Sequence, residues 1–381
     1  MIEITRRVVP AAGRAVLTLF LAFCFASSLA ADCYRREIVK CAVVTLDASA
    51  IEGNAKSGTP FELVLGKTSL SVALWPAPVW PKEGLPVLEI GKDNRLVTQQ
   101  IVTGNITYAG EVVGEDPATS EARFTIARGV LEGYVRSSTG WWFLEPLARF
   151  DPKAGPDTYL VYATRDVNMV IDFGEDGVPS DKVYDRNGRI GMVMVADAQY
   201  VALSDEFFFW ERQASLLNKV NGIYQDQVGR SFKLDYSLID GQGEIFTSTN
   251  ATVLLHMLAL WVGVMGGVEG MNTHFVHLTT GKTLDGDVEG IAFRPGEVGL
   301  SRQLSDTFAF RNMMVAAHEI GHNFNGVHGQ AEDRCPGSDV CMSIMFQIFF
   351  GNNAPEFSDG TMDPSKNNKQ RIISNMLSRG F

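Results

Sequence analysis

The sequence predicts a mixed α/β (α+β) fold with a mixed sheet, preceded by a β-rich domain. Residues 41–170 contain short runs of strand-forming residues separated by Gly, Pro and Asp, without a long helical period. After residue 189, strand-like and helix-like runs alternate. Residues 318–328 then hold three of the six histidines of the chain, in the order His-Glu-Ile-Gly-His-Asn-Phe-Asn-Gly-Val-His.

Length and composition exclude several classes of protein. With 381 residues, 45% of them hydrophobic, the chain can bury a full core and is long enough for two domains. The net charge of -11 argues against nucleic acid and against anionic membrane surfaces as partners, because proteins that bind phosphate groups usually gather Lys and Arg into a patch.

Residues 1–31 have the pattern of a secretory signal peptide. Arg6, Arg7 and Arg14 precede or enter an apolar run, residues 16–26, and small residues follow up to Ala31. The alternative is a membrane anchor, but the run is shorter than the roughly twenty residues of a spanning helix, and no second such stretch follows. Asp32 stands where a lipid-anchored protein would need Cys. We therefore expect a secreted protein, extracellular or periplasmic, without a transmembrane segment after the signal.

Export permits disulfides, and four cysteines remain after the signal. They form two close pairs, Cys33 with Cys41 and Cys335 with Cys341. Pairing by proximity is the simplest of three connectivities, and the sequence alone does not choose among them.

The predicted organisation is a β-rich domain at residues 32–171, a linker at 172–188 and a second domain at 189–381. The linker is rich in Gly, Asp and other polar residues, which favours exposure. The alternative is an ordinary surface loop inside one larger domain.

The second domain should alternate strands and helices. Strands are expected at residues 190–201, 232–239, 273–279, 290–293 and 298–303, and a buried helix at 252–265. Ser204, Asp205 and Glu206 should cap a helix that reaches Tyr224, and residues 305–307 the helix that leads into the histidine motif. His256, His274 and His277 are expected to be structural.

The histidine motif has the spacing of a catalytic zinc site. His318 and His322 lie one turn apart on the same helix face, so both imidazoles can point at one ion. Glu319 lies beside that point and can act on a water there without becoming a ligand. A helix breaker and His328 follow, which favours a third ligand over two solvent-facing histidines. The fourth position then stays open, as a catalytic Zn²⁺ site requires.

With these residues the chain resembles the metzincin zinc proteases, most closely the adamalysin or reprolysin-like branch of the ADAM proteins and the snake-venom metalloproteases. In the second domain the resemblance rests on residues 273–281, 290–293, 298–301, 343–345 and 356–358. It implies a metzincin-like fold with an active-site helix and a substrate-facing edge strand at Val298, Gly299, Leu300 and Ser301. It also implies a Met-turn under the metal, with Met345 favoured over Met342.

The β-rich half resembles the prodomain of the same family, through residues 108–114, 129–133, 142–147, 160–162 and 166–167. The resemblance implies that this half inhibits the protease or assists its folding. Two departures stand out. Asn325 replaces the usual Gly after the second His, so the turn should lie on Asn325 or Gly326. No Cys lies between Cys41 and Cys335, which argues against latency through a prodomain cysteine unless Cys33 or Cys41 reaches the metal.

The sequence thus predicts a secreted zinc metalloendopeptidase that cleaves a protein or peptide substrate, with Glu319 as general base. One alternative is an exported binding or structural protein whose zinc domain is degenerate or only a scaffold. The intact Glu319 counts against it. Another is hydrolysis of a non-peptide amide by the same zinc chemistry.

Overall fold

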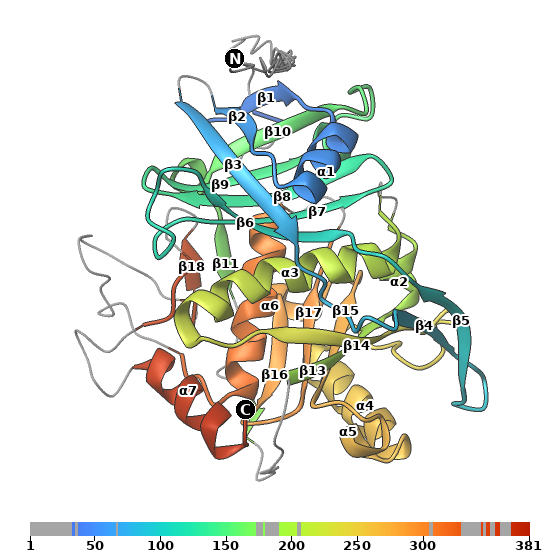
Figure 1. Ribbon diagram of the computed structural model, residues 1–381. Coiled ribbons are helices and arrows are strands. Elements are labelled where there is room, and N and C mark those ends of the chain that lie inside the picture. The colour runs from blue at the N-terminus through green and yellow to red at the C-terminus, as the bar shows by residue number, and fades with distance from the viewer. Residues whose placement is uncertain are drawn as a thin grey trace, which may run out of the picture.

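The computed structural model describes residues 33–34, 37–65, 68–172, 178–179, 190–203, 207–304, 308–328, 344–345, 348–350, 355–358 and 367–381. Two large sheets stack with helices between and outside them (Figure 1). Among the described residues, no helix is both long and apolar enough to cross a membrane.

The first sheet is built from the N-terminal half and is antiparallel throughout. Strands β6 to β9 are joined by short loops, so neighbours in sequence pair in space. In spatial order the strands are β1 (Ala42–Thr45), β10 (Thr158–Ala163), β9 (Gly140–Pro146), β8 (Val130–Ser137), β7 (Glu121–Ala127), β6 (Thr107–Val112), β3 (Thr68–Pro76) and β2 (Phe61–Leu65).

The second sheet is mixed. Its central strands are parallel, and β16 runs antiparallel to β17. In spatial order the strands are β12 (Val178–Pro179), β16 (Gly290–Arg294), β17 (Val298–Arg302), β15 (Phe275–Thr280), β13 (Ile190–Ala196), β14 (Phe232–Ile239), β4 (Leu85–Ile90) and β5 (Leu96–Val102). A small separate pair joins β11 (Val170–Asp172) to β18 (Ile348–Phe350).

The helices fill the layers around the two sheets. Helices α3 (Phe209–Val228) and α6 (Ala309–Asn323) lie between the sheets and share one hydrophobic cluster with both (Figure 1). Helix α1 (Ala48–Ser57) covers the far face of the first sheet, and α4 (Ala251–Val264) the far face of the second. The remaining helices are α2 (Ala198–Val201), α5 (Gly267–Gly270) and α7 (Asn368–Ser378), with single-turn 3-10 helices at Leu147–Arg149, Thr164–Asp166 and Asp285–Asp287.

The alternation of side chains on β13 explains why the second sheet is covered on both faces. Met192 and Met194 pack toward α3 and α6, whereas Val193 and Val195 pack toward α4. All seven residues of the strand are buried. Such a strand is apolar without interruption, as expected for a parallel strand between two helical layers.

The hairpin β4–β5 belongs to the second sheet through the pairing of β4 with β14, although it precedes most of the first sheet in sequence. Two expectations about the elements are corrected. The strand at 190–201 ends at Ala196, because the Asp197 side chain accepts from Tyr200 N at 2.8 Å and caps α2. Helix α4 is buried on one face only, and Leu260 is 72% exposed.

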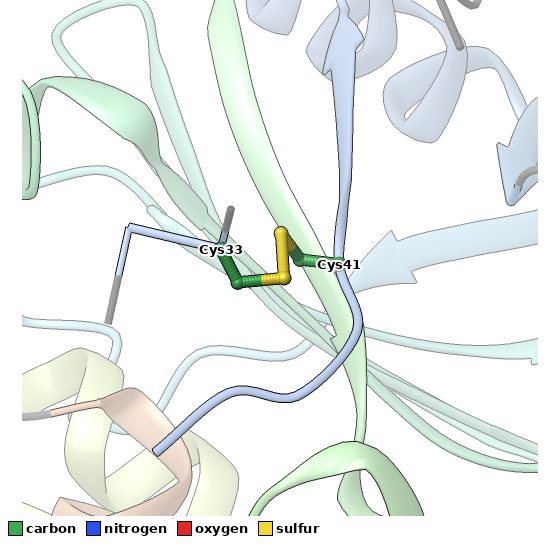
Figure 2. Close-up of a disulfide and its surroundings, with 2 residues drawn as sticks. All are labelled: Cys33 and Cys41. Carbon is green, nitrogen blue, oxygen red and sulfur yellow. A yellow bond between two sulfur atoms is a disulfide. The ribbon is translucent and has the colours of Figure 1, made fainter. Parts of the chain in front are cut away.

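The N-terminal disulfide predicted by proximity is present. Cys33 and Cys41 are bonded, with their Cα atoms 5.8 Å apart (Figure 2). The bond fixes the chain directly before β1, where Cys41 packs against the central hydrophobic cluster. Cys335 and Cys341 lie outside the described residues.

A buried network of charges joins the first sheet to α3 and α6. Glu132 on β8 accepts from Lys219 on α3 and, at 2.8 Å, from Arg149. Arg149 also contacts Glu145 on β9 at 3.1 Å, and Glu145 accepts from Ala309 N, at the start of α6, at 2.9 Å. Burial alone would raise the pKa of Glu132, but Lys219 and Arg149 outweigh it and hold that pKa far below its usual range. Glu132 is therefore ionised in the folded state.

Candidate metal centre

Helix α6 carries the first part of the histidine motif into the centre of the molecule. Its residues Phe310, Met313 and Ala317 pack into the cluster between the sheets. His318 and His322 follow at helical spacing and are almost completely buried. The two imidazoles therefore lie in the protein interior and not on a solvated surface.

The three predicted histidines converge. Nε2 of His328 lies 3.1 Å from Nε2 of His318 and 3.2 Å from Nε2 of His322. One nitrogen from each ring lies within 4.8 Å of the others. Three nitrogens bound tetrahedrally to one Zn²⁺ at ~2.0–2.1 Å would be separated by about 3.3 Å, so the observed spacing fits a zinc ion.

Backbone carbonyls fix the orientation of two of these rings. Nδ1 of His318 lies 2.6 Å from Ile344 O, and Nδ1 of His322 lies 2.9 Å from Gly326 O. Since a carbonyl oxygen only accepts, each Nδ1 donates its proton and each Nε2 keeps its lone pair for a metal. Burial, and then the neighbouring imidazoles, lower the pKa of His318 well below 6.5, which favours the neutral form that a metal needs.

The turn after α6 lies on Asn325, one of the two positions expected from the sequence. Asn325 has φ 68°, in the left-handed region that asparagine tolerates better than most residues. Gly326 N then donates to Gly321 O at 2.8 Å, which closes the helix end. A Cβ on Gly326 would lie 2.8 Å from that same oxygen, so the close approach requires glycine. The turn brings His328 back toward the helix.

Glu319 is buried beside the histidines, with 1% of its surface exposed. Among the described residues, neither carboxylate oxygen has a hydrogen-bond partner. Burial raises the pKa of Glu319 well above 4.5. A buried carboxylate without protein partners is costly for stability and is typical of a group kept for chemistry.

Gly290 on β16 forms the wall behind Glu319. A Cβ at this position would lie 2.7 Å from Glu319 Cγ, 2.8 Å from Glu319 Oε1 and 2.9 Å from Leu300 O. The backbone oxygen cannot move away, so the glutamate side chain would have to shift. The absence of a side chain at residue 290 therefore sets the position of Glu319.

We expect Gly290→Ala to lower kcat with little change in zinc affinity, because it displaces Glu319 and leaves the three histidines in place. The overpacking should also cost about 1–3 kcal/mol of folding free energy. Steady-state kinetics, zinc titration and urea unfolding of the purified variant would measure all three quantities. A variant with wild-type kcat would show that the position of Glu319 does not depend on the absence of a side chain at residue 290.

Met345 lies directly under the helix turn that joins the two helical histidines. A Cβ on Gly321 would lie only 2.4 Å from Met345 Sδ, so methionine and helix are in close contact there. Met345 is fully buried, and the preceding Ile344 supplies the carbonyl for His318. The Met-turn at Met345 stays a prediction, and the other candidate, Met342, lies outside the described residues.

The predicted substrate edge at Val298–Ser301 is misplaced. These residues form β17, which pairs with β15 on one side and with β16 on the other, so its backbone groups are already used. Strand β16 lies nearer the edge of the sheet, and among the described residues β12 pairs with it at Phe293 and Arg294. The expectation came from the family resemblance, and a run of strand-forming residues does not reveal which of two neighbouring strands lies nearer the edge of a sheet.

The other histidines do not join the centre. His277 is buried on β15 and hydrogen-bonded to Ser301 Oγ at 2.9 Å, and burial lowers its pKa to about 4. His274 Nδ1 accepts from Gly191 N at 2.8 Å. His256 is hydrogen-bonded to Thr252 O at 2.7 Å but is exposed, not packed in the core. All three have structural contacts, and none points to a second metal site.

The chain is similar to two solved structures and, in part, to one protein family. Metalloproteinase-II from Bacteroides fragilis is 13% identical, with a TM-score of 0.49 over 86% of this chain and 94% of that chain. A chaperone–substrate complex is also 13% identical, with a TM-score of 0.33 over 67% of this chain and 39% of that chain. Residues 210–329, which include His318, Glu319, His322 and His328, match the reprolysin-like metallopeptidases of family M12B.

Proposed function

We propose that the chain is a secreted zinc-dependent metalloendopeptidase that hydrolyses peptide bonds. The observation that carries the proposal is the convergence of three Nε2 atoms next to a buried carboxylate that has no partner among the described residues. The match of residues 210–329 to a metallopeptidase family supports it. The donor set fits zinc, because three neutral imidazoles and one open position are typical of catalytic zinc sites.

His318, His322 and His328 would hold the ion. A bound Zn²⁺ supplies Lewis acidity, which polarises the scissile carbonyl and makes water a nucleophile near neutral pH. Glu319 would accept the proton of the attacking water and pass it to the leaving amine. Glu319 is suited to both transfers because it is buried beside the three histidines and, among the described residues, neither of its carboxylate oxygens is engaged in a hydrogen bond.

An extended peptide could bind along the outer side of β16. Strand addition to a sheet edge provides backbone hydrogen bonds that do not depend on the side chains of the substrate. Gly290, on this strand, touches Glu319, so a peptide paired here would pass close to the proposed base. Because β12 already pairs at Phe293 and Arg294, the peptide would bind nearer to Gly290 or displace β12.

The disulfide supports export. Disulfides persist in oxidising compartments and are rare in the cytosol, and the Cys33–Cys41 bond lies just after the predicted signal peptide. The proposed location is therefore extracellular or periplasmic, and a protein or peptide is the proposed substrate.

The experiment is casein hydrolysis by the purified chain before and after zinc removal by a chelator. We expect activity to be lost with the metal and to return when Zn²⁺ is restored. His322→Ala should be inactive and zinc-free, whereas the exposed His256→Ala should match the wild type in both respects. Full hydrolysis by a zinc-free sample would refute the proposal.

A further inference from the structure

Asn368 at the start of α7 makes a two-bond contact with the chain next to His328. Its Oδ1 accepts from Val327 N at 2.9 Å, and its Nδ2 donates to Val327 O at 3.0 Å. Asn368 is fully buried, although it lies 41 residues away in sequence. Nδ2 also lies 3.2 Å from Ser358 Oγ, which helps to fix the plane of the amide.

This contact fixes the backbone on both sides of Val327. The N–H of Val327 belongs to the peptide plane shared with Gly326, and its C=O belongs to the plane shared with His328. The rigid side-chain amide of Asn368 binds both the N–H and the C=O of Val327, so it fixes the orientation of both peptide planes. The position of the His328 Cα follows, because this atom belongs to the second plane. Residues 326–328 have no helix or strand of their own that would do this.

We propose that Asn368 is a positioning residue for the third metal ligand, so that α7 is part of the metal centre. The inference rests on the proposed zinc site. The two helical histidines need no such help, because α6 and the carbonyls of Ile344 and Gly326 orient them. His328 lies beyond the helix end, where the turn and, through Val327, the Asn368 amide fix the backbone that carries it.

The chain contains a matched control. Asn221 on α3 makes the same two-bond contact with the backbone of Phe232, where Oδ1 accepts from N at 2.7 Å and Nδ2 donates to O at 2.9 Å. Asn221 is buried as well, and Phe232 opens β14, which carries no proposed ligand. Asn221→Ala and Asn368→Ala therefore delete the same kind of contact, and only the second lies next to a ligand.

The experiment compares the full-length wild type, Asn368→Ala and Asn221→Ala. Zinc affinity is measured by competition with a chromophoric chelator, coordination geometry by the absorption spectrum of the Co²⁺ form, and stability by urea unfolding of the apo forms. Loss of a group bonded directly to a ligand side chain typically weakens metal binding by 10–100-fold. Asn368 acts one residue away through the backbone, so we expect a zinc affinity about 10-fold weaker in Asn368→Ala, at the lower end of that range, with an altered Co²⁺ spectrum. Asn221→Ala should be destabilised but keep wild-type affinity and spectrum.

Equal affinity and identical Co²⁺ spectra in Asn368→Ala and the wild type would overturn the inference and leave the zinc site intact. A wild type that binds no zinc would overturn the proposed function, and this inference with it. If Asn368→Ala does not fold, hydrogen exchange at the Val327 amide of the wild-type apo protein decides. Protection is expected there without metal, and exchange at the rate of an open loop would contradict the role of Asn368.

Discussion

Glu319→Gln is expected to slow peptide hydrolysis by roughly 10²–10⁴-fold, the usual contribution of a general acid–base group. The amide has the shape of the carboxylate but cannot accept the proton of the attacking water. Gln has the same number of heavy atoms as Glu, so it should fit the buried space against Gly290 without disturbing the histidines. The measurement is kcat and KM on a fluorogenic peptide, together with zinc content by atomic absorption.

The zinc content separates the chemistry from the metal site. We expect one zinc per chain in Glu319→Gln, as in the wild type, and a fall that lies in kcat and not in KM. The variant should also be more stable than the wild type, because it removes a carboxylate that is buried without a protein partner. Activity close to the wild type would mean that another group takes the proton.

Lys219→Met is expected to destabilise the folded chain by about 3–5 kcal/mol, since it leaves the buried charge of Glu132 without one of its two cationic partners. Methionine keeps most of the volume of the lysine stem, so the loss should come from the charge and not from a cavity. Urea unfolding followed by circular dichroism measures the change. Because Lys219 lies on α3 and Glu132 on β8, the variant tests the attachment of the first sheet to the helical layer.

A second substitution checks that the loss arises from the unpaired charge. In Lys219→Met/Glu132→Gln the side-chain amide at residue 132 is neutral and needs no cationic partner. It can still form hydrogen bonds with Arg149 and Ser215, both of which donate to Glu132 in the wild type. We expect the double variant to be more stable than Lys219→Met alone, with a coupling free energy of about 1–3 kcal/mol. Additive losses would show that the two side chains act independently.

The local features of the site could be predicted from the sequence because its spacing is helical. His318 and His322 one turn apart, with Glu319 beside them, define a face of a helix without further information. The turn at Asn325 was predictable as well, since few residues other than Gly and Asn adopt a positive φ.

The rest depends on contacts between distant parts of the chain. Nothing in residues 85–102 indicates that their hairpin pairs with β14 and not with the first sheet, because strand patterns specify a buried face and not a partner. Asn368 was missed for a similar reason. Two adjacent asparagines at the start of a helix predict an N-cap, a role that Asn367 fills, and that pattern gives no sign of a bond between Asn368 and Val327.

The start of α6 also depends on a contact that the local sequence does not reveal. The sequence suggested a cap from residues 305–307, which lie outside the described residues. The structure instead shows the carboxylate of Glu145, from β9, accepting from Ala309 N. A negative charge at a helix N-terminus stabilises the helix. Through Glu145, the first sheet therefore stabilises the start of the helix that carries the histidines. The division into a β-rich domain, a linker and a second domain stays a prediction.

The proposed function requires one zinc ion between the three imidazoles. Diffraction from crystals of the purified chain, collected on both sides of the zinc absorption edge, would locate that ion. We expect one anomalous peak at ~2.0–2.1 Å from the Nε2 atoms of His318, His322 and His328, with a fourth position not taken by protein. A peak elsewhere, or a peak that His328 does not contact, would contradict it.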